Sequence, residues 1–312
     1  MSSSEEGNLK MNHTSLERDS TVLYATELRE NQDRDVIVVA QVARARQASV
    51  TLLHVMEMQW RFSQPFLEEA FYRHHRQHAS ERSEDVQQLL VNAEVQCGTC
   101  MLKTGSVVEE ILDVAQSLGS SLIALGAGDV ELRGGPGMTA LAVMESAPQS
   151  VLIGQPGRQF TQLKTILCPV DHSRPSRFGL EEAIRLARGA NARLIVLSII
   201  PEVSWLAAAA EVGQFKDAKE EYEAQWAEGL DEFLAVVDFD GVSWTQELER
   251  GASHEQIPII AKKVAADLIV MGATGRTGLV RTLLGSTTRR VLRELPCSIL
   301  VVREQKDIDP TA

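Results

Sequence analysis

The segment "MGATGRTGLVRTLLGSTTRRVL", residues 271–292, changes character halfway along its length. Its first fifteen residues include four glycines, and the polar run that begins at Ser286 has the pattern of a helix start. Glycine is favoured where a backbone must approach another group closely or take a positive φ. A helix N-terminus presents unpaired N–H groups and a partial positive charge. The segment therefore predicts an anion site, and a nucleotide phosphate is the anion that matches it best.

This segment belongs to the second of two similar halves of the chain. "TVLYATEL" (21–28) resembles "TILCPVDH" (165–172), and 165 minus 21 gives a displacement of 144 positions. "APQSVLIGQ" (147–155) resembles "LPCSILVVR" (295–303), where 295 minus 147 gives a displacement of 148. Self-similarity of this kind indicates an internal duplication. The Gly-, Pro- and Gln-rich residues 154–162 are the expected joint between the copies.

Each copy alternates short apolar runs with helical patterns, as in "RLIVLSII" (193–200) followed by a long amphipathic stretch. Strands that are apolar on both faces are typical of parallel sheets covered by helices. We therefore predict an α/β protein with two doubly wound five-stranded parallel-sheet domains in tandem, each with strand order 3-2-1-4-5. The edge strands "SVLIG" (150–154) and "SILVV" (298–302) are expected to pair and join the two domains.

Length and composition agree with this organisation. The 312 residues are 44% hydrophobic and 24% charged, which is enough for two globular cores. We predict a flexible arm over residues 1–20, a first domain over 21–158, a second over 163–304 and a tail over 305–312. We find no secretory or membrane-spanning pattern, so a cytoplasmic protein without membrane insertion is expected. A net charge of −12 argues against nucleic acid as a main partner.

Ligands of doubly wound sheets bind beyond the carboxyl ends of the strands, where the strand order reverses. In the second copy this point lies between the strand that ends in Pro169, Val170 and Asp171 and the strand that ends at Gly272. A carboxylate beside phosphates is repulsive, so we expect Asp171 to face the base or ribose of a nucleotide. Two alternatives stay open, namely a bound Mg²⁺ and a purely structural cap on the following turn.

The glycine spacing carries a resemblance to a known family. Gly272, Gly275, Gly285 and Ser286 match the pattern G-x2-G-x9-G-[ST] at every position. Here the sequence resembles the universal stress protein family in its tandem form, strongly over residues 163–304 and weakly over the first copy. The resemblance implies an adenine nucleotide alpha hydrolase-like fold and cytoplasmic, often dimeric proteins of stress physiology, some of which bind ATP.

The resemblance also assigns roles to residues. It implies that Asp171 lies near the adenine, that the main chain of Ile199 borders the base, and that Gly272 lies near the ribose. Gly275, Gly285, Ser286 and Thr287 would lie near the phosphates. The complete set of predicted nucleotide-binding residues is Pro169, Val170, Asp171, Ile199, Met271, Gly272, Gly275, Arg276, Gly285, Ser286, Thr287 and Thr288.

The first copy departs from this pattern. Gly126 and Gly137 align with the first and last glycines of the motif, but the loop between them is two residues shorter, since 137 minus 126 is 11 whereas 285 minus 272 is 13. Asp129 occupies the region of the second glycine, Met138 replaces the serine, and Glu27 replaces the aspartate after the first strand. A carboxylate in the phosphate loop and a thioether in place of a hydroxyl both disfavour a triphosphate. We predict that this half holds an empty or altered site.

A second chemistry is suggested by "CGTC", because Cys97 and Cys100 have the spacing of a zinc or redox motif. His74 and His78, four residues apart on an expected helix, would complete a set of four ligands. We place the two cysteines in the third strand. Side chains alternate between the two faces of a strand, so Cys97 and Cys100 would point to opposite faces and could not bind one metal ion together. The simpler interpretation is therefore two small apolar residues and a solvated histidine face.

The leading hypothesis is an ATP-binding regulator of the stress response with one competent site, in the C-terminal domain. It forms a homodimer and acts on a regulatory protein partner that the sequence does not identify. His172 and His254 are placed to approach the ligand, but they fit no recognised catalytic arrangement. The chain is therefore expected to act without fast turnover, although slow ATP hydrolysis is compatible with it. The rivals are a nucleotide-independent interaction scaffold and an ATP-using transferase or hydrolase.

Overall fold

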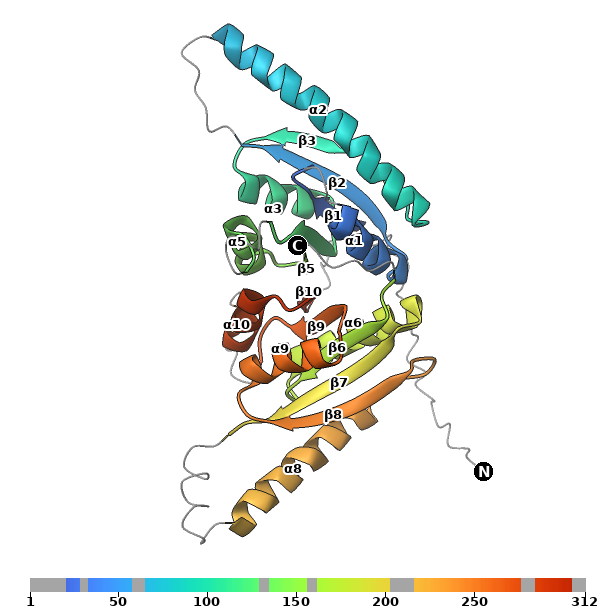
Figure 1. Cartoon of the computed structure of the whole chain (residues 1–312), viewed down its shortest axis with the longest axis vertical. Coiled ribbons are helices and arrows are strands. Elements are labelled where there is room, and N and C mark those ends of the chain that lie inside the picture. Colours follow the sequence, from blue (N-terminus) through green and yellow to red (C-terminus); the bar gives the residue numbers. More distant parts are fainter. Residues whose placement is uncertain are drawn as a thin grey trace, which may run out of the picture.

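The computed structural model describes residues 21–28, 33–57, 65–128, 135–155, 162–202, 216–275 and 284–304. These residues form an elongated molecule in which one ten-stranded sheet runs through the centre and helices cover both of its faces (Figure 1). The helices α2 and α8 lie at opposite ends of the long axis. Among the described helices, none combines the length and apolarity needed to cross a membrane.

The two halves repeat the same succession of elements. The first half contains β1 (Thr21–Ala25), α1 (Asp33–Ala45), β2 (Ser49–Met56), α2 (Pro65–Asn92), β3 (Met101–Thr104), α3 (Val107–Ser117), β4 (Leu122–Gly126), α5 (Met138–Ser146) and β5 (Ser150–Gly154). The second half contains β6 (Thr165–Val170), α6 (Arg174–Ala190), β7 (Arg193–Ile200), α8 (Lys216–Ala235), β8 (Trp244–Arg250), α9 (Ser253–Lys263), β9 (Leu268–Gly272), α10 (Ser286–Glu294) and β10 (Ser298–Val302).

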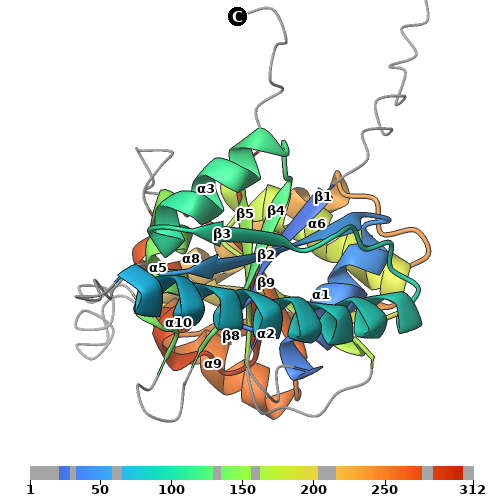
Figure 2. The same ribbon diagram turned by 90° about the horizontal axis from the view of Figure 1, so that it is seen from above.

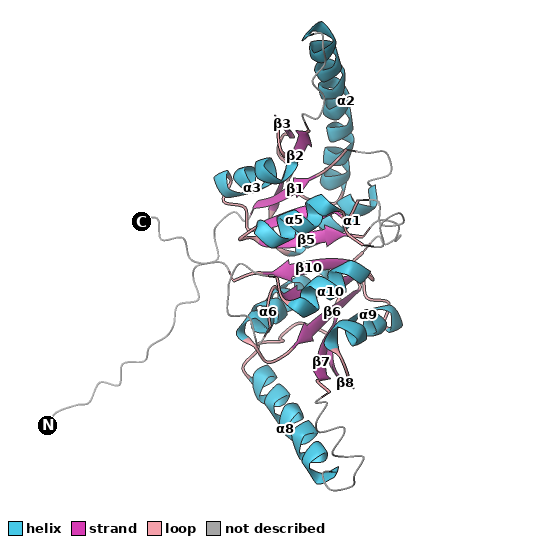
Figure 3. Ribbon diagram, turned by 90° about the vertical axis from the view of Figure 1, so that its left-hand side faces the viewer, coloured by secondary structure: helices cyan, strands magenta, loops and turns pink. Residues whose placement is uncertain are grey.

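The strand order is β3-β2-β1-β4-β5-β10-β9-β6-β7-β8. Each half therefore has the predicted order 3-2-1-4-5, and all pairs within a half are parallel. The predicted pairing of the two edge strands is also confirmed, because β5 and β10 pair antiparallel with Ile153 opposite Ile299. The two predicted sheets are thus one continuous sheet (Figure 3).

The core has two layers because the central strands are apolar on both faces. All five residues of β5, β9 and β10 are buried. One layer packs under α1, α2, α6 and α8, and the other under α3, α5, α9 and α10. Figure 2, which looks along the length of the molecule, shows α2 and α3 on opposite sides of β2 and β3. The sequence pattern of fully apolar strands thus produces the covered parallel sheet that it predicts.

Helices α1 and α6 pack closely across the boundary between the halves. A Cβ added to Gly189 would lie 2.7 Å from the Cα of Ala45, so only glycine permits this helix contact. Beside it the Arg46 guanidinium lies 2.9 Å from a carboxylate oxygen of Glu182, and both side chains are buried. Burial lowers the pKa of Arg46 from its ordinary value. The two halves therefore share a buried ion pair as well as a strand pair.

Backbone and side-chain bonds repeat across the β5–β10 pair with approximate two-fold symmetry. The amide of Gln155 donates to the Ser298 hydroxyl at 3.1 Å, and the amide of Arg303 donates to the Ser150 hydroxyl at 3.2 Å. The Arg303 guanidinium also donates to the carbonyl of Met144 at 2.8 Å. These bonds fix the register of the pair that joins the halves.

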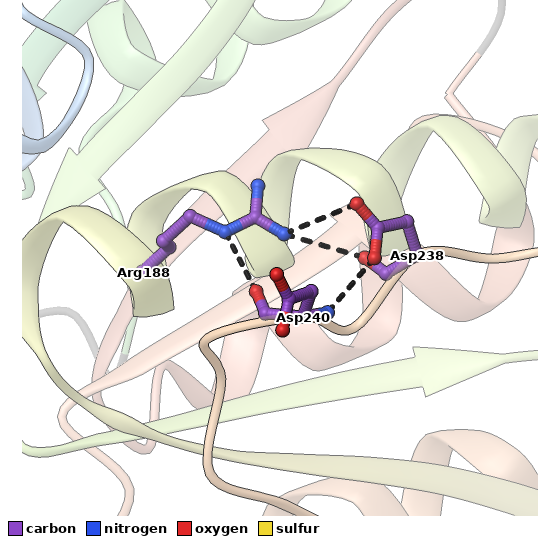
Figure 4. Close-up of polar contacts among 3 residues, drawn as sticks. All are labelled: Arg188, Asp238 and Asp240. Atoms are coloured by element: carbon purple, nitrogen blue, oxygen red, sulfur yellow. Dashed lines mark hydrogen bonds and ion pairs between the residues drawn. The ribbon is translucent and has the colours of Figure 1, made fainter.

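Helix α8 is tied to α6 at its C-terminal end. The Arg188 side chain donates from Nε to the Asp240 carbonyl at 2.9 Å, and one of its terminal nitrogens lies 3.7 Å from a carboxylate oxygen of Asp238 (Figure 4). Asp238 in turn accepts a hydrogen bond from the amide of Asp240 at 2.9 Å. The loop that follows α8 is therefore anchored to the body of the second half.

Candidate functional site

The strand order of the second half reverses between β6 and β9, which are neighbours in the sheet. Val170 ends β6, Gly272 ends β9, and α10 begins at Ser286, as the sequence predicts. The site residues that the sequence names thus follow two adjacent parallel strands at the same edge of the sheet. This is where an open α/β sheet binds its ligand.

The first turn of α10 has the properties of an anion site. Its N-cap is Gly285, with extended backbone (φ −62°, ψ 151°) and no side-chain cap among the described residues. Ser286 is exposed and Thr287 is half-buried. Gly285 donates its own amide to the Ala273 carbonyl at 2.8 Å, which fixes the start of the helix against the end of β9. Helix amides that no side chain caps are suited to bind an anion.

Asp171 connects the first strand of this half to the glycine loop. Its Oδ1 accepts hydrogen bonds from the amide and hydroxyl of Ser173, so the carboxylate does cap the turn, as one of the three alternatives predicts. A Cβ on Gly275 would lie 2.5 Å from Oδ2 of Asp171. The carboxylate and the second glycine of the motif are therefore in contact, and a larger residue at position 275 would displace the carboxylate.

The glycines are needed for close packing of protein against protein. Gly272, Gly275 and Gly285 have no left-handed φ, so of the two reasons that favour glycine the close approach of another group is the one that applies to them. A Cβ on Gly272 would lie 2.6 Å from the Pro175 carbonyl in the first turn of α6. A Cβ on Gly285 would lie 3.3 Å from the Ala273 carbonyl. The glycines bring α6, β9 and α10 together, and they thereby form the edge at which the ligand is predicted to bind.

The other predicted residues form the apolar side of this edge. Ile199 and Met271 are buried in one cluster with Leu284, which lies directly before the N-cap of α10. Val170 is also buried, on the opposite face of the sheet. Pro169 is half-buried within β6.

Thr288 differs from the nearby Ser286 and Thr287 in its solvent exposure. It is buried, and its hydroxyl donates to the Gly272 carbonyl at 3.2 Å. This bond holds α10 on the end of β9. The side chain of Thr288 thus has a packing role, whereas Ser286 and Thr287 are accessible.

Two arginines of α10, Arg289 and Arg290, contact side chains outside the predicted nucleotide site. A terminal nitrogen of Arg289 lies 3.2 Å from a carboxylate oxygen of Glu145 on α5, in the other half. Arg290 lies 3.2 Å from a ring nitrogen of His254, at the start of α9. Arg276, which the sequence places in the site, lies outside the described residues. The described part of the site therefore offers amides and hydroxyls to an anion.

His172, directly after Asp171, lies in a cluster that the sequence does not predict. Its backbone is left-handed, with φ 64°. Its Nε2 lies 3.4 Å from the Ser198 hydroxyl, which accepts a 3.0 Å hydrogen bond from the indole nitrogen of Trp226. The His172 and Trp226 rings have centroids 4.8 Å apart. A serine inside the apolar run of residues 193–200 is the signal that could have revealed a buried polar partner.

The first half repeats the backbone of the site but not its side chains. Gly137 caps α5 and donates to the Ala127 carbonyl at 2.9 Å, which repeats the geometry of Gly285. Met138 is 77% exposed where the second half has Ser286. Glu27 is exposed at the position of Asp171. Asp129 lies outside the described residues.

Asp35 is a further departure of the first half, which sequence reasoning missed. Adding 144 to its number gives 179, and residue 179 in the second half is a glycine whose Cβ would lie 3.0 Å from the Gly272 amide. Asp35 is buried against Gly126 and Gly154. Burial, with a smaller contribution from the charge of Glu27, raises its pKa to about 7. Comparing the repeats position by position would have revealed it.

The C-x-x-C sequence does not form part of a described metal centre. Cys97 makes an isolated bridge with Val50, and β3 begins only at Met101, so the placement of both cysteines within the third strand was wrong. Burial raises the pKa of Cys97 to about 11 and also raises that of Cys100. Within the described ranges, no three His, Cys, Asp or Glu side chains gather as metal ligands. His74 and His78, on α2, are exposed.

Comparisons with known proteins agree with this geometry. The profile of the universal stress protein family matches residues 20–154 and 162–303. A universal stress protein of Methanocaldococcus jannaschii is 33% identical over 143 residues, which is 46% of this chain and 84% of that protein. One from Synechocystis is 30% identical over 148 residues, which is 44% of this chain and 96% of that protein.

Two solved structures share the arrangement of the whole chain. The crystal structure of a universal stress protein from Archaeoglobus fulgidus superposes with a TM-score of 0.65 at 19% identity, covering 93% of this chain and 98% of that one. A structure from Pseudomonas aeruginosa gives a TM-score of 0.67 at 21% identity, with coverages of 92% and 94%. At these identities the superpositions show the fold.

Proposed function

Because the chain belongs to the universal stress protein family, whose profile matches both of its halves, we propose that it is a stress-response regulator that binds ATP in its C-terminal half. The observation that carries the proposal is the meeting of three features at one sheet edge. These are the uncapped first turn of α10, the carboxylate of Asp171, and the glycine that touches this carboxylate, Gly275.

In the proposed complex, main-chain amides bind the phosphates. The amides of Ser286 and Thr287 and their hydroxyls accommodate the phosphate oxygens, because they lie at the positive end of α10. Asp171 accepts hydrogen bonds from the base or ribose with the oxygen that faces Gly275. Ile199 and Met271 supply an apolar border. The phosphate end of the ligand therefore meets hydrogen-bond donors, and the nucleoside end meets an acceptor and an apolar surface.

Mg²⁺ is compatible with this arrangement as an ion brought by the nucleotide. Asp171 supplies the kind of oxygen that Mg²⁺ prefers. The described residues include no group of three metal-ligating side chains, so phosphate oxygens and water would complete the coordination. When bound, Mg²⁺ would neutralise part of the charge of the triphosphate.

The first half is proposed to support the second without binding ATP itself. Met138, which is exposed, replaces the serine at the helix start, and the buried carboxyl group of Asp35 packs against Gly126 and Gly154 where the second half has a glycine. The helix start therefore lacks the hydroxyl proposed to bind phosphate, and the strand ends are filled by a side chain that the second half does not have. One nucleotide per chain is therefore expected.

Calorimetric titration of the purified chain with ATP, ADP and AMP tests the proposal, with two matched variants. Gly285→Val forces a side chain against the Ala273 carbonyl, 3.3 Å from the Cβ position, and should weaken ATP binding by at least about tenfold, since each lost hydrogen bond to a charged group is worth more than 1 kcal/mol. Gly137→Val makes the same change in the first half, where the nearest atom lies at 3.6 Å. It should leave the affinity for ATP unchanged.

The rival function, a scaffold that needs no nucleotide, is favoured by one observation. Each motif glycine already has a packing reason to be glycine, independent of any ligand. A scaffold predicts no saturable heat with any adenine nucleotide at millimolar concentration. That result with folded protein would refute the proposed ATP site.

A further inference from the structure

His172 links the proposed nucleotide site to helix α8 through direct contacts. It follows Asp171, and the turn that Asp171 caps includes it, because the Asp171 carboxylate bonds to the amide of Ser173 at 3.1 Å. Its ring lies under α8, with Nδ1 3.4 Å from the Cβ position of Gly229. A change in the conformation of this turn therefore moves the imidazole ring of His172, against which α8 packs.

The contact with α8 is specific in its chemistry. The ring of His172 stacks at a tilt against Trp226 and lies 5.8 Å, centroid to centroid, from Phe233. The Ser198 hydroxyl lies within 3.4 Å of the imidazole and accepts the indole N–H of Trp226. Arg177 of α6 lies over the ring of Phe233 at 4.5 Å. The imidazole thus touches β7 and two aromatic residues of α8, in a space that Gly229 leaves open.

The backbone of His172 is left-handed, with φ 64°. This conformation is uncommon for a residue with a Cβ, although histidine adopts it more often than most residues do. The equivalent residue of the first half, Leu28, has nearly the same φ, 53° against 64°. The turn is therefore common to both halves, whereas the histidine, Ser198 and Trp226 occur together in the half with the complete glycine motif.

Helix α8 is suited to respond to such a change. It is the outermost helix of its half and lies at the end of the molecule (Figure 1). The loop that follows its C-terminal end is anchored to Arg188 of α6, and His172 contacts the helix itself at Trp226 and Gly229. A helix held near its C-terminal end can tilt about that end, and the contact with His172 at Trp226 resists the tilt.

We propose that His172 is a positioning residue that couples the nucleotide site to α8, so that a bound adenine nucleotide tightens the docking of α8 on β7. This inference rests on the proposed function. A ligand that bonds to Asp171 fixes the turn of residues 171–173, and the fixed turn holds the imidazole against Trp226. Because coupling is reciprocal, the docked helix also strengthens nucleotide binding.

Hydrogen exchange measured by mass spectrometry on the full chain tests the coupling, with and without saturating ATP. In the unaltered protein, ATP should slow exchange of the amides in α8 around Trp226. In His172→Gly the backbone keeps access to the left-handed turn but the ring is lost. ATP should then bind about fivefold more weakly, and saturating ATP should leave α8 exchange unchanged. Leu28→Gly is the control, because it alters the equivalent turn of the other half and should preserve the response of α8.

The possible results separate the inference from the proposed function. If calorimetry detects ATP binding but α8 exchanges equally with and without it, the coupling is refuted and the ATP site stands. The same conclusion follows if His172→Gly keeps the full response. If the unaltered chain binds no ATP, both proposals fail. Should His172→Gly not fold, His172→Asn replaces it, since asparagine tolerates a left-handed φ and lacks the ring that stacks on Trp226.

Discussion

Replacing Asp35 with asparagine should change how the stability of the protein depends on pH. The carboxyl group is buried, and its two oxygens lie 2.5 Å from the Cβ position of Gly126 and 3.0 Å from that of Gly154. Its Oδ1 has no hydrogen-bond partner among the described residues. Burial and the charge of Glu27 raise its pKa from 3.8 to about 7. Asparagine keeps the shape of the side chain and removes the titration.

The sign and size of the effect follow from the two pKa values. A carboxyl group with a raised pKa binds its proton more tightly in the folded state, so its contribution to stability is complete below about pH 4 and is lost as the pH rises to about 7. A shift of about three pH units corresponds to about 4 kcal/mol at 1.4 kcal/mol per unit. This is a ceiling, because water penetration and relaxation around the carboxylate reduce it.

Urea unfolding followed by circular dichroism between pH 4.5 and 8.5 measures the effect. The stability of Asp35→Asn relative to the unaltered protein should increase from the acid end to about pH 7 and level off above it, by up to about 3 kcal/mol over this range. The control is Asp113→Asn, which removes an exposed carboxylate from α3 and should leave the profile parallel to that of the unaltered chain. If the Asp35→Asn profile is also parallel, the buried carboxyl does not titrate as argued and the reasoning is wrong.

Three other outcomes can be measured on the same protein. Arg46→Met should destabilise the chain by up to about 3 kcal/mol in urea, because the buried Glu182 keeps only the half-exposed Arg185, at 3.4 Å, as an ion-pair partner, and Arg46→Met combined with Glu182→Leu should recover most of the loss. Alkylation of Cys97 by iodoacetamide should keep accelerating up to about pH 11, and a plateau near pH 9 would contradict the raised pKa. Gly189→Leu should lower the unfolding midpoint by the equivalent of about 1–3 kcal/mol, because its Cβ would lie 2.7 Å from the Cα of Ala45; an unchanged midpoint would show that α1 and α6 separate at little cost.

The architecture could be predicted from the sequence because it depends on patterns that repeat. Apolar runs mark the strands, and the repeat between the copies assigns each strand a counterpart, displaced by 144 positions for the first two strands and by 148 for the last, since 298 minus 150 is 148. The strand order and the β5–β10 pairing then follow from general rules for parallel sheets and their edges. The helix start at Ser286 could be predicted for the same reason, because it is a local signal.

The individual contacts could not be predicted, because they depend on residues distant in sequence. The reason that position 272 is glycine lies in the carbonyl of Pro175, almost a hundred positions earlier. The histidine after Asp171 stacks on a tryptophan of a helix that begins 44 positions later, since 216 minus 172 is 44. The cysteine motif was misplaced for a related reason, since Cys97 pairs with Val50 only as a single bridge and strand β3 starts after the motif.

Fusion of two copies into one chain explains how the halves came to differ. In a symmetric dimer of identical domains, an aspartate in place of a glycine, the difference between Asp35 and Gly179, would be present in both sites at once. Here the buried pair of Arg46 and Glu182 and the antiparallel strands β5 and β10 supply the contacts of such a dimer within one chain. The first half can therefore carry different side chains at the ends of its strands and still complete the sheet. The strand edge that joins the halves is used internally, so a second chain could extend the described sheet only at its outer strands, β3 or β8.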